Sequence, residues 1–514
     1  MRRLVLSRTT WLFFVIVWLA WACFTTRYAM LDDALIHLRY AEFLRSTHLI
    51  TYDGVHPDYG TSSLLYVSLL AFLRGLTTSP LLPKIVSICA YFGLLASLWS
   101  ISCRLKTSVW AKRLSVALLI GFLTPMAIRW LTDGMETSLT LLLITWVAIL
   151  SHKIARAQTT SAWGWFALPV VGAALVLMRI ELVMLACLVG LLLCGPQILF
   201  SSASRGQAVG RALALLTGTV IVMAVITLRF GHLLPDTALA KSGRPSIVPI
   251  FGVIHVTISS FMLGIGTTII AIASAVIVLR KMTQRGVSKD RFFSWAIANA
   301  SYWIILVLAC VRGQAIQGIR YILWPLVFSS VWNILELEEL EREYPAPAPA
   351  SRSITAFTYA YVLLAILIIP MDAWYGFHAM MGRSKTFLQM RNSGLASLRG
   401  ETIVAGDVGF ISYFSQGNIC DVDGLVNGRA VAALPPDLRY QRCAEAKPKA
   451  LFLTSNQLRS LSSHLSLDDW SQCAVIDFQN VNSHDRHYLM LKKTDQSQLC
   501  AEVHQRDAHA SGEE

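Results

Sequence analysis

Long apolar runs recur along most of the chain, and they limit its possible folds more than any other feature. A helix needs roughly 17 to 25 predominantly apolar residues to cross about 30 Å of hydrocarbon. Eleven such runs lie near residues 10–29, 82–103, 114–130, 137–151, 163–178, 182–200, 211–228, 250–279, 293–311, 321–336 and 354–370. The eighth is long enough to include an interfacial helix before its span. We therefore predict a multi-spanning α-helical membrane protein with about 11 transmembrane helices.

The composition agrees with this prediction. Of the 514 residues, 55% are hydrophobic and 15% are charged, and the mean hydropathy is +0.54, which lies outside the range of soluble globular proteins. The net charge of +13 would also suit a nucleic-acid-binding protein. In so apolar a chain, loops that face the cytoplasm or anionic lipid explain the basic excess more simply. We expect membrane lipid as a partner and no nucleic acid.

Basic residues gather in alternate loops between the runs. They are Arg2, Arg3 and Arg8 before the first run, Arg104, Lys106, Lys112 and Arg113 after the second, Lys153 and Arg156 after the fourth, Arg205 and Arg211 after the sixth, and Arg280, Lys281, Arg285, Lys289 and Arg291 after the eighth. By the positive-inside rule, these loops and the N-terminus are cytoplasmic, and the tail from about residue 371 lies outside. Lys84, Lys241 and Arg244 then fall on the outside. The first run has a long apolar core and no small-x-small site before Leu31, which favours an uncleaved anchor over a signal peptide.

Ionisable residues follow every odd-numbered run up to the ninth, so they gather on the outer face. They are Asp32 and Asp33 after the first run, Asp133 and Glu136 after the third, Arg179 and Glu181 after the fifth, Asp236 and Lys241 after the seventh, and Arg312 and Arg320 after the ninth, with Tyr321 beside them. A charge at the edge of hydrocarbon costs a few kcal/mol unless it is paired, hydrated or functional. The repeated placement predicts a polar cavity on this face.

Simpler interpretations apply to some of these residues. Lys84 and Arg229 suit interfacial anchors whose charged ends reach water. Arg179 and Glu181 are two positions apart, and such residues do not face each other on a helix, so we expect them to have separate partners. The simpler interpretation of the adjacent acids after the first run is the start of a solvated loop. In the alternative, the two carboxylates repel each other, and this repulsion raises the pKa of one of them. A carboxyl with a raised pKa suits a base or a metal ligand.

The first outer loop, residues 30–63, contains two predicted helices. Its first half has a roughly helical apolar period, which favours an amphipathic helix lying along the membrane surface and holding the two acids rigidly. The period consists of Ala34, Leu35, Leu38, Ala41, Phe43 and Leu44. After turn signals at Asp53-Gly54 and Pro57, a second apolar helix opens with Thr61, Ser62 or Ser63 as its N-cap. Such a helix start favours a phosphate or another anion.

Six motifs along the chain together resemble a known class of enzyme. They are DDALIHLRY, DGMETSL, LMRIEL, LLPDTALAK, IRYILWPL and GDVGFISYFSQGNICDVDGLVN. Their order and common sidedness are similar to the multi-spanning GT-C glycosyltransferases, and within these to the arabinofuranosyltransferases that add terminal residues to actinobacterial cell-wall arabinan and to their bacterial relatives. The resemblance covers residues 28–430. The chain departs from the pattern at Ile180, where an R-P-E tripeptide would have proline, and at Asp236, where relatives often carry L-P-N.

The resemblance implies an inverting transfer of a sugar, with arabinofuranose as the first candidate, from a polyprenyl-phosphate donor to a cell-envelope glycan or glycoconjugate at the bacterial inner membrane. It makes Asp33, or else Asp32, the base that deprotonates the acceptor. The implied contacts to the donor phosphate are Lys241, Arg320, Arg179 and Arg39, and those to the substrates are Glu136, Glu181, Asp236, Tyr321, Tyr59 and Ser62.

The sequence leaves cofactors open. Asp32, Asp33, Glu136 and Asp236 are oxygen ligands that suit a hard divalent cation, but Arg and Lys alone can neutralise a monophosphate donor, and we prefer that interpretation. Zinc-ligand spacing of His and Cys is missing, so His37, His48 and His56 are expected to be surface residues or substrate contacts. The sequence also lacks the glycine patterns that bind nucleotides.

The tail from 371 to 500 is more polar and predicts a small α/β domain outside the membrane. Five segments are typical of short strands, namely ETIVAGDVG, NICDVDGL, KALFLTS, QCAVIDF and RHYLMLKK, with a helix near 384–398. Asp407, Asp421 and Asp423 either contact glycan hydroxyls or cap turns. Cys420, Cys443, Cys473 and Cys500 suit two disulfides of undetermined connectivity. We expect residues 501–514 to be disordered, and the acidic run LELEELERE to extend the tenth span into the cytoplasm.

Other functions remain open at this point. A transporter of lipid-linked sugars would use a similar charged cavity but would be expected to have internal repeats. A non-enzymatic scaffold would not need paired acids together with cations from several runs. Among enzymes, a transferase of mannose, another hexose or aminoarabinose to lipopolysaccharide or protein has the same motifs available, because acceptor choice depends on loops without readable signals.

Overall fold

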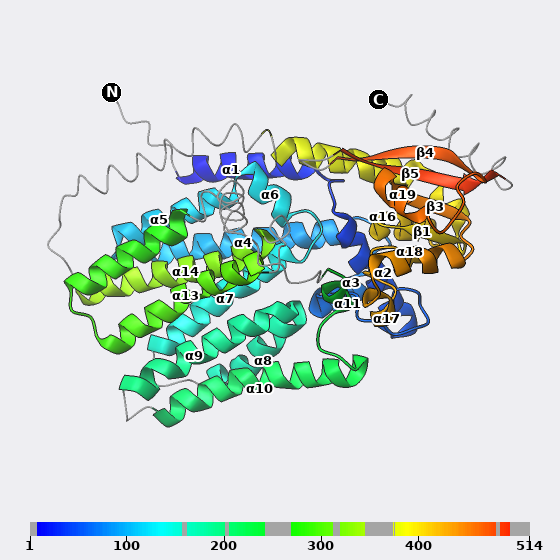
Figure 1. The fold of residues 1–514 in the computed structure, drawn as a ribbon. Helices are drawn as coiled ribbons and strands as arrows, with labels where there is room; N and C mark the ends of the chain where they lie inside the picture. The colour runs from blue at the N-terminus through cyan, green and yellow to red at the C-terminus, as the bar shows by residue number, and fades with distance from the viewer. Residues whose placement is uncertain are drawn as a thin grey trace.

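The computed structural model describes residues 8–156, 162–200, 205–241, 269–311, 319–344, 374, 376–479 and 484–493. It consists of an elongated helical bundle with a smaller sheet-containing domain at one end (Figure 1). The bundle helices are α1 (Arg8–Thr25), α4 (Leu82–Arg104), α5 (Val109–Phe122), α6 (Pro125–Leu131), α7 (Thr137–Arg156), α8 (Ala162–Met178), α9 (Val183–Phe200), α10 (Arg205–Phe230), α13 (Lys289–Val311), α14 (Ile319–Glu343) and an unlabelled helix over 269–284.

These helices coincide with the predicted apolar runs where the structure describes them. The run at 354–370 and residues 250–268 of the eighth run lie outside the described residues. Within the described part, four helical segments are long and apolar enough to cross a membrane: α4, α7, α10 and Ile180–Phe200. A fifth results if α5 and α6 form one span, which bends by 71°. The bend falls where Pro125 opens α6 and the Thr124 side chain caps it. The full count of 11 spans stays a prediction.

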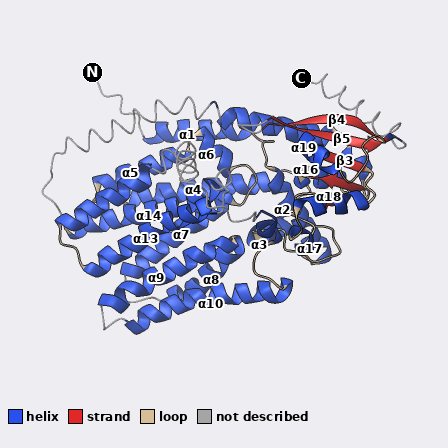
Figure 2. Cartoon of the chain, in the orientation of Figure 1, coloured by secondary structure: helices blue, strands red, loops and turns tan. Residues whose placement is uncertain are grey.

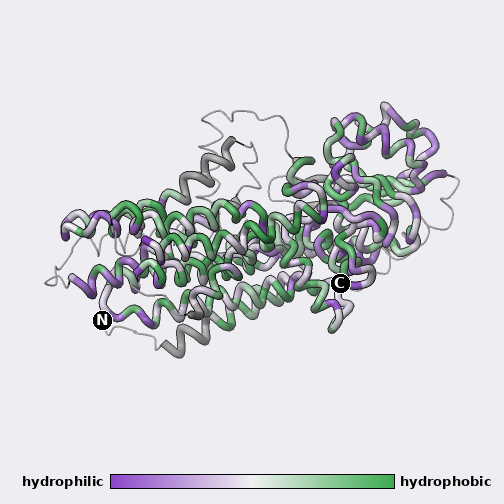
Figure 3. Tube along the Cα trace, turned by 90° about the horizontal axis from the view of Figure 1, so that it is seen from below, coloured by the Kyte–Doolittle hydropathy of each residue, from purple (hydrophilic) through white to green (hydrophobic). Residues whose placement is uncertain are grey.

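The outer surface of the bundle is apolar along its middle, and polar residues gather at its ends (Figure 3). Leu228 on α10 is 86% exposed and Phe166 on α8 is 72% exposed. Apolar surface of this kind is unfavourable in water and suits contact with lipid. The hydropathy pattern and the fold therefore agree on a membrane protein.

A network of charged residues ties the helices together at the end of the bundle far from the sheet. The buried Glu336 carboxylate on α14 contacts Arg156 and His152 from α7 and Arg291 from α13. Two residues further along α14, Glu338 accepts hydrogen bonds of 2.8 Å from the backbone amides of residues 106–108, just before α5 begins. The acidic run thus continues α14 as predicted, and it also pairs with the basic loops.

Two short helices lie between the bundle and the sheet: α2 (Asp32–Thr47) and α3 (Leu64–Leu73). The first is helical as predicted, but residues 34–41 are buried on every side and not along one face. The reason is that α2 packs against α3, α4 and helix α16 of the sheet domain. The prediction of a helix at this place is therefore confirmed, but its predicted position along the membrane surface is wrong. The helix α2 lies inside the molecule, between the bundle and the sheet domain.

The C-terminal domain is a five-stranded sheet with helices, as the tail sequence predicts (Figure 2). Its elements are β1 (Thr402–Ala405), α16 (Val408–Ser415), β2 (Asn418–Asp421), α17 (Arg429–Ala432), α18 (Pro436–Glu445), β3 (Ala450–Thr454), α19 (Ser455–Leu461), β4 (Trp470–Gln479) and β5 (His484–Lys492). The strand order is β2-β1-β3-β5-β4, with β1 parallel to β2 and β3, and β5 antiparallel to β3 and β4. The helix before the sheet spans 376–392. It ends before the predicted residue 398 because Gly394 adopts the left-handed conformation with φ of 70°.

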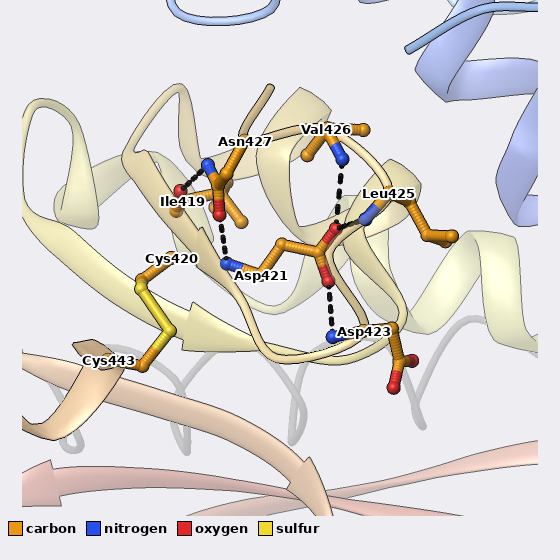
Figure 4. Close-up of a disulfide and its surroundings, with 8 residues drawn as sticks. All are labelled: Ile419, Cys420, Asp421, Asp423, Leu425, Val426, Asn427 and Cys443. Carbon is orange, nitrogen blue, oxygen red and sulfur yellow. Dashed lines mark hydrogen bonds between the residues drawn. A yellow bond between two sulfur atoms is a disulfide. The ribbon is translucent and has the colours of Figure 1, made fainter. Parts of the chain in front are cut away.

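A disulfide joins Cys420 on β2 to Cys443 on α18 (Figure 4). Cys473 is also disulfide-bonded, and Cys500 lies outside the described residues. The structure therefore supplies one pairing that the sequence left open. Disulfides persist in oxidising compartments.

Candidate active site

The two adjacent acids that begin α2 have different surroundings. The Asp32 carboxylate accepts hydrogen bonds from the backbone amides of Gly409 (2.8 Å) and Phe410 (2.6 Å) at the start of α16. Successive residues of a helix point about 100° apart, so Asp33 points elsewhere, and it is half-buried. Asp32 therefore holds the C-terminal domain onto α2, and the two acids have different environments.

Burial raises the pKa of Asp32, and the nearby Asp407 carboxylate raises it further, while the two amide hydrogen bonds lower it. Asp407 immediately precedes α16, and its Oδ2 lies 2.6 Å from Nε2 of the buried His487. Both acids thus lie at the positive end of the α16 dipole, where a negative charge is favourable. Asp407 has a partner within the domain, which fits the structural role that the sequence left open beside glycan contact.

Arg39 holds the other end of α16. Its Nη1 donates to the Ser412 carbonyl at 2.8 Å, its Nη2 to the Gly417 carbonyl at 3.2 Å, and its Nε to the Tyr52 carbonyl at 3.3 Å. The contacts with Ser412 and Gly417 satisfy carbonyl oxygens at the C-terminal end of α16. The negative end of a helix dipole favours a cation at this position. We therefore correct the expected role of Arg39: its guanidinium positions the C-terminal domain, and this leaves the donor phosphate to other cations.

Gly409 allows this close contact between α2 and α16. A Cβ atom at this position would overlap the backbone carbonyl of Asp32. We expect Gly409→Ala to lower the free energy of unfolding by about 1 to 3 kcal/mol, as for other overpacked sites. Thermal unfolding of the purified protein measures the change. Gly206, where a Cβ meets nothing within 4 Å, is the matched control, and equal effects of the two alanine substitutions would contradict the proposed contact.

A chain of buried polar side chains connects α2 to the bundle. Nδ1 of His37 lies 3.0 Å from Thr61 Oγ1, and its Nε2 lies 3.4 Å from Glu136 Oε2. The other oxygen of Glu136 pairs with Arg179, whose Nη2 lies 3.2 Å from Glu181 Oε1. Glu136 is 1% exposed and Arg179 6% exposed. The outer face therefore carries a buried cation between two carboxylates.

The pairing of Arg179 with Glu181 corrects the expectation that they have separate partners. Arg179 has an extended backbone with φ of −160° and ψ of 133°, which separates α8 from the short helix that follows. The i to i+2 rule for helices does not apply to such a residue. Arg179 also lies over the Trp324 ring, 5.2 Å from its centroid. The Arg179 guanidinium is thus held by two carboxylates and an indole ring, and its contact with the donor phosphate stays a prediction.

Tyr59 and Asp236 join the first outer loop to the start of α11 (Asp236–Lys241). The Asp236 amide donates to the Tyr59 carbonyl at 2.7 Å, and the Tyr59 amide donates to Asp236 Oδ2 at 3.3 Å. Oδ1 of Asp236 lies 3.6 Å from His232 Nε2. The Tyr59 ring stacks on Phe230 at 4.9 Å, and its buried hydroxyl has no hydrogen-bond partner among the described residues.

The other predicted residues have less definite positions. Ser62 is half-buried one residue before Ser63, which occupies the N-cap position of α3 without a side-chain cap. Lys241 ends α11, and Arg320 and Tyr321 lie in the first turn of α14. The side chains of these last three lie outside the described part of the structure, so their roles stay predictions.

The structure adds residues that the sequence did not single out. His232 lies four residues before its partner Asp236, and Trp324 lies beneath Arg179 although it is far from it in sequence. His37, which was expected at the surface or in contact with substrate, is 5% exposed and lies between Thr61 and Glu136. Lys84 is wrongly predicted as an interfacial anchor: it is 2% exposed, and its Nζ donates to the Ala29 carbonyl at 3.0 Å and to Thr132 Oγ1 at 3.3 Å. Arg229 is exposed, in line with an anchor.

The four acids considered for a cation do not form a cluster in the described structure, because Asp32 binds α16 amides and Asp236 binds the Tyr59 amide. A group of three possible metal ligands among the described residues is His152, Glu336 and Glu339, at the opposite end of the bundle. Arg156 already pairs with both of these glutamates. The structure thus gives no support for a cation at the outer face.

Asp421 has a structural role, in line with the turn-capping alternative. Its carboxylate is fully buried and accepts hydrogen bonds from the amides of Asp423 (2.8 Å), Leu425 (2.5 Å) and Val426 (3.1 Å), as Figure 4 shows. Asn427 accepts from the Asp421 amide and donates to the Ile419 carbonyl. These contacts fix the turn after β2.

This buried carboxyl predicts a dependence of stability on pH. Burial raises the pKa of Asp421 to about 7, whereas an unfolded Asp has a pKa of about 3.9. The folded domain keeps this proton to higher pH than the unfolded chain does, so the free energy of unfolding falls as the pH rises from about 4 to 7, by up to about 1.4 kcal/mol per unit. We expect Asp421→Asn to reduce this slope in thermal unfolding curves. Exposed Asp469→Asn is the control, and an unchanged slope in Asp421→Asn would contradict the assignment.

The fold of the chain is similar to that of ArnT from Cupriavidus metallidurans, whose crystal structure has undecaprenyl phosphate bound. The TM-score is 0.54 at 12% identity, over 96% of this chain and 99% of that chain. A weaker likeness, with a TM-score of 0.42 at 10% identity, relates 89% of the chain to 71% of the archaeal oligosaccharyltransferase AglB from Archaeoglobus fulgidus, in complex with an inhibitory peptide and a dolichol-phosphate. Residues 382–498 match a domain of unknown function (DUF8728). No curated protein matches the sequence. The likeness to ArnT confirms the predicted GT-C-like fold, and at this identity it concerns the fold alone.

Proposed function

We propose that the protein is a membrane glycosyltransferase that takes its sugar from a polyprenyl-phosphate donor. The observation that carries the proposal is the combination of acids and a buried cation beside the C-terminal domain: α2 begins with Asp32, which binds α16, and with the half-buried Asp33, and Arg179 lies buried between Glu136 and Glu181. The fold likeness to ArnT, whose structure holds undecaprenyl phosphate, supports a lipid-linked donor.

The chemistry follows from these groups. Asp33 accepts the proton of the acceptor hydroxyl as the acceptor oxygen bonds to the anomeric carbon. The bond between this carbon and the phosphate oxygen breaks, and the polyprenyl phosphate leaves with the electron pair. Arg179 stabilises the charge that develops on the leaving phosphate, together with Lys241 and Arg320. A single displacement inverts the configuration of the anomeric carbon.

Glu136 and His37 support this arrangement without touching the reacting atoms. Glu136 pairs with Arg179, and His37 connects Glu136 to Thr61. A buried guanidinium that is held from both sides reorganises little during the reaction. We assign substrate contacts to Glu181, Tyr59, Asp236, Tyr321 and Ser62.

We place the protein in a bacterial inner membrane with the C-terminal domain on the periplasmic side. The basic loops lie at the end of the bundle far from this domain (Figure 1), as the positive-inside rule requires. The disulfide between Cys420 and Cys443 suits an oxidising compartment. The acceptor is then a cell-envelope glycan or glycoconjugate.

The first test of the proposal is phosphate-dependent lipid binding. Purified protein in nanodiscs should bind undecaprenyl phosphate and not undecaprenol of the same chain length, as measured by native mass spectrometry. Equal binding of the two lipids would argue against a donor site for a lipid phosphate.

The identity of the transferred sugar is the more specific part of the proposal. Arabinofuranose is the first candidate, on the motif resemblance, and aminoarabinose, mannose and other hexoses are the alternatives. Synthetic polyprenyl-phosphate sugars of each type, offered separately with a cell-envelope extract, identify the donor through the release of polyprenyl phosphate. Movement of the intact lipid-linked sugar across the membrane without its cleavage would indicate a transporter.

A further inference from the structure

Several independent contacts hold the turn between β2 and α17 in place. The Asp421 carboxylate caps it from within, and the disulfide ties its first residue, Cys420, to α18. From outside, Arg439 donates to the carbonyls of Ala432 and Asp423. Surface turns rarely carry so many constraints unless their position matters.

This braced turn, residues 420–433, lies against the candidate site. A Cβ atom on Gly60 in the first outer loop would lie 2.8 Å from the Leu425 carbonyl oxygen. The helix α17, which lies within this segment, packs against α11. Helix α11 begins with Asp236 and ends with Lys241. The C-terminal domain therefore contributes one wall of the region around Tyr59 and Asp236.

Arg429 projects from this wall. Its side chain is exposed, and it begins α17, which packs against α11 where Asp236 lies. Burial raises the pKa of Asp236, and the positive charges of His232 and Arg429 offset part of this rise. Yet no hydrogen bond or ion pair of Arg429 with another described side chain occurs, and Asp236 uses the Tyr59 amide and His232 as its partners. Arg429 is therefore an exposed cation on a braced segment that packs against α11, and it is free to meet an anionic ligand there.

We propose that Arg429, held by the braced turn of the C-terminal domain, binds the phosphate of the polyprenyl-phosphate donor. This inference rests on the proposed function and adds a cation from outside the bundle to the predicted phosphate contacts. Arginine suits this role because its planar fork matches phosphate oxygens. The C-terminal domain is then part of the donor site, and its docking through Asp32 and Arg39 positions a ligand contact.

The test measures the affinity of nanodisc-embedded protein for undecaprenyl phosphate. A charge-assisted hydrogen bond is worth about 1.5 to 3 kcal/mol, so we expect Arg429→Ala to weaken binding roughly 10- to 100-fold. Arg429→Lys should recover part of this loss. Arg442→Ala removes an exposed arginine of the same domain and should leave the affinity unchanged. Undecaprenol, which lacks the phosphate, is the negative control and should stay unbound by the wild type and all three variants.

The outcomes separate this inference from the proposed function. If the wild type binds undecaprenyl phosphate and Arg429→Ala binds it equally well, the inference is wrong and the proposed function stands. If Arg429→Ala lowers only the rate of transfer and not the affinity, Arg429 acts on the acceptor and the inference is also wrong. If the wild type does not bind the lipid phosphate, the proposed function itself fails. A Cys420→Ser and Cys443→Ser double variant should weaken binding in the same direction, because it loosens the turn.

Discussion

Replacing Asp33 by asparagine should lower the rate of sugar transfer roughly 10²- to 10⁴-fold, the usual contribution of a general base. Asparagine has nearly the same size but cannot accept the proton of the acceptor hydroxyl. Binding of undecaprenyl phosphate should persist, because the cations that face the phosphate are unchanged. The measurement compares single-turnover transfer with lipid binding in the same preparation.

The neighbouring substitution Asp32→Asn is the matched comparison. It removes the same charge one residue away, but at a carboxylate that accepts two amide hydrogen bonds from α16. We expect lower thermal stability with the transfer rate per folded molecule largely retained. The opposite pattern, with transfer lost in Asp32→Asn and kept in Asp33→Asn, would exchange the roles of the two acids.

Replacing Glu336 by glutamine should lower the free energy of unfolding by about 3 to 5 kcal/mol, the usual result of breaking a buried ion pair from one side. The carboxylate is fully buried and pairs with Arg156, Arg291 and His152. Glutamine would leave the buried guanidinium of Arg291 and the half-buried one of Arg156 without their shared counter-charge. Thermal unfolding in nanodiscs measures the effect.

Glu341 on the same helix provides the control for this experiment. Among the described residues, its carboxylate pairs with Lys281 and is partly exposed, so Glu341→Gln should cost about 1 kcal/mol or less. Comparable losses from both substitutions would show that the network around Glu336 does not hold the bundle together.

The sequence predicts the elements of this fold well because their signals are local. Apolar runs of spanning length become helices, and all five predicted strand segments form strands of one sheet. The internal position of α2 could not be predicted, since an amphipathic period indicates one buried face. Its remaining face is covered by α16, which lies more than 370 residues later in the chain.

The candidate site was also predicted in part, for similar reasons. The common sidedness of the charged residues predicts Glu136, Arg179 and Glu181 at one place, and the structure joins them. It could not distinguish Asp32 from Asp33, because only the distant amides of α16 separate their environments. The role of Arg39 could not be predicted for the same reason. The sequence does not show whether an arginine contacts the carbonyl oxygens of a helix end or a phosphate.

The most direct measurement of the central claim is the release of polyprenyl phosphate by the purified protein. The wild type in nanodiscs is given a pooled panel of polyprenyl-phosphate sugars together with a cell-envelope acceptor fraction, and Asp33→Asn is assayed beside it. We expect the wild type to release polyprenyl phosphate in step with the appearance of glycosylated acceptor, and Asp33→Asn to release almost none. Consumption of nucleotide sugars in place of the lipid-linked ones, or equal release by Asp33→Asn, would contradict the account.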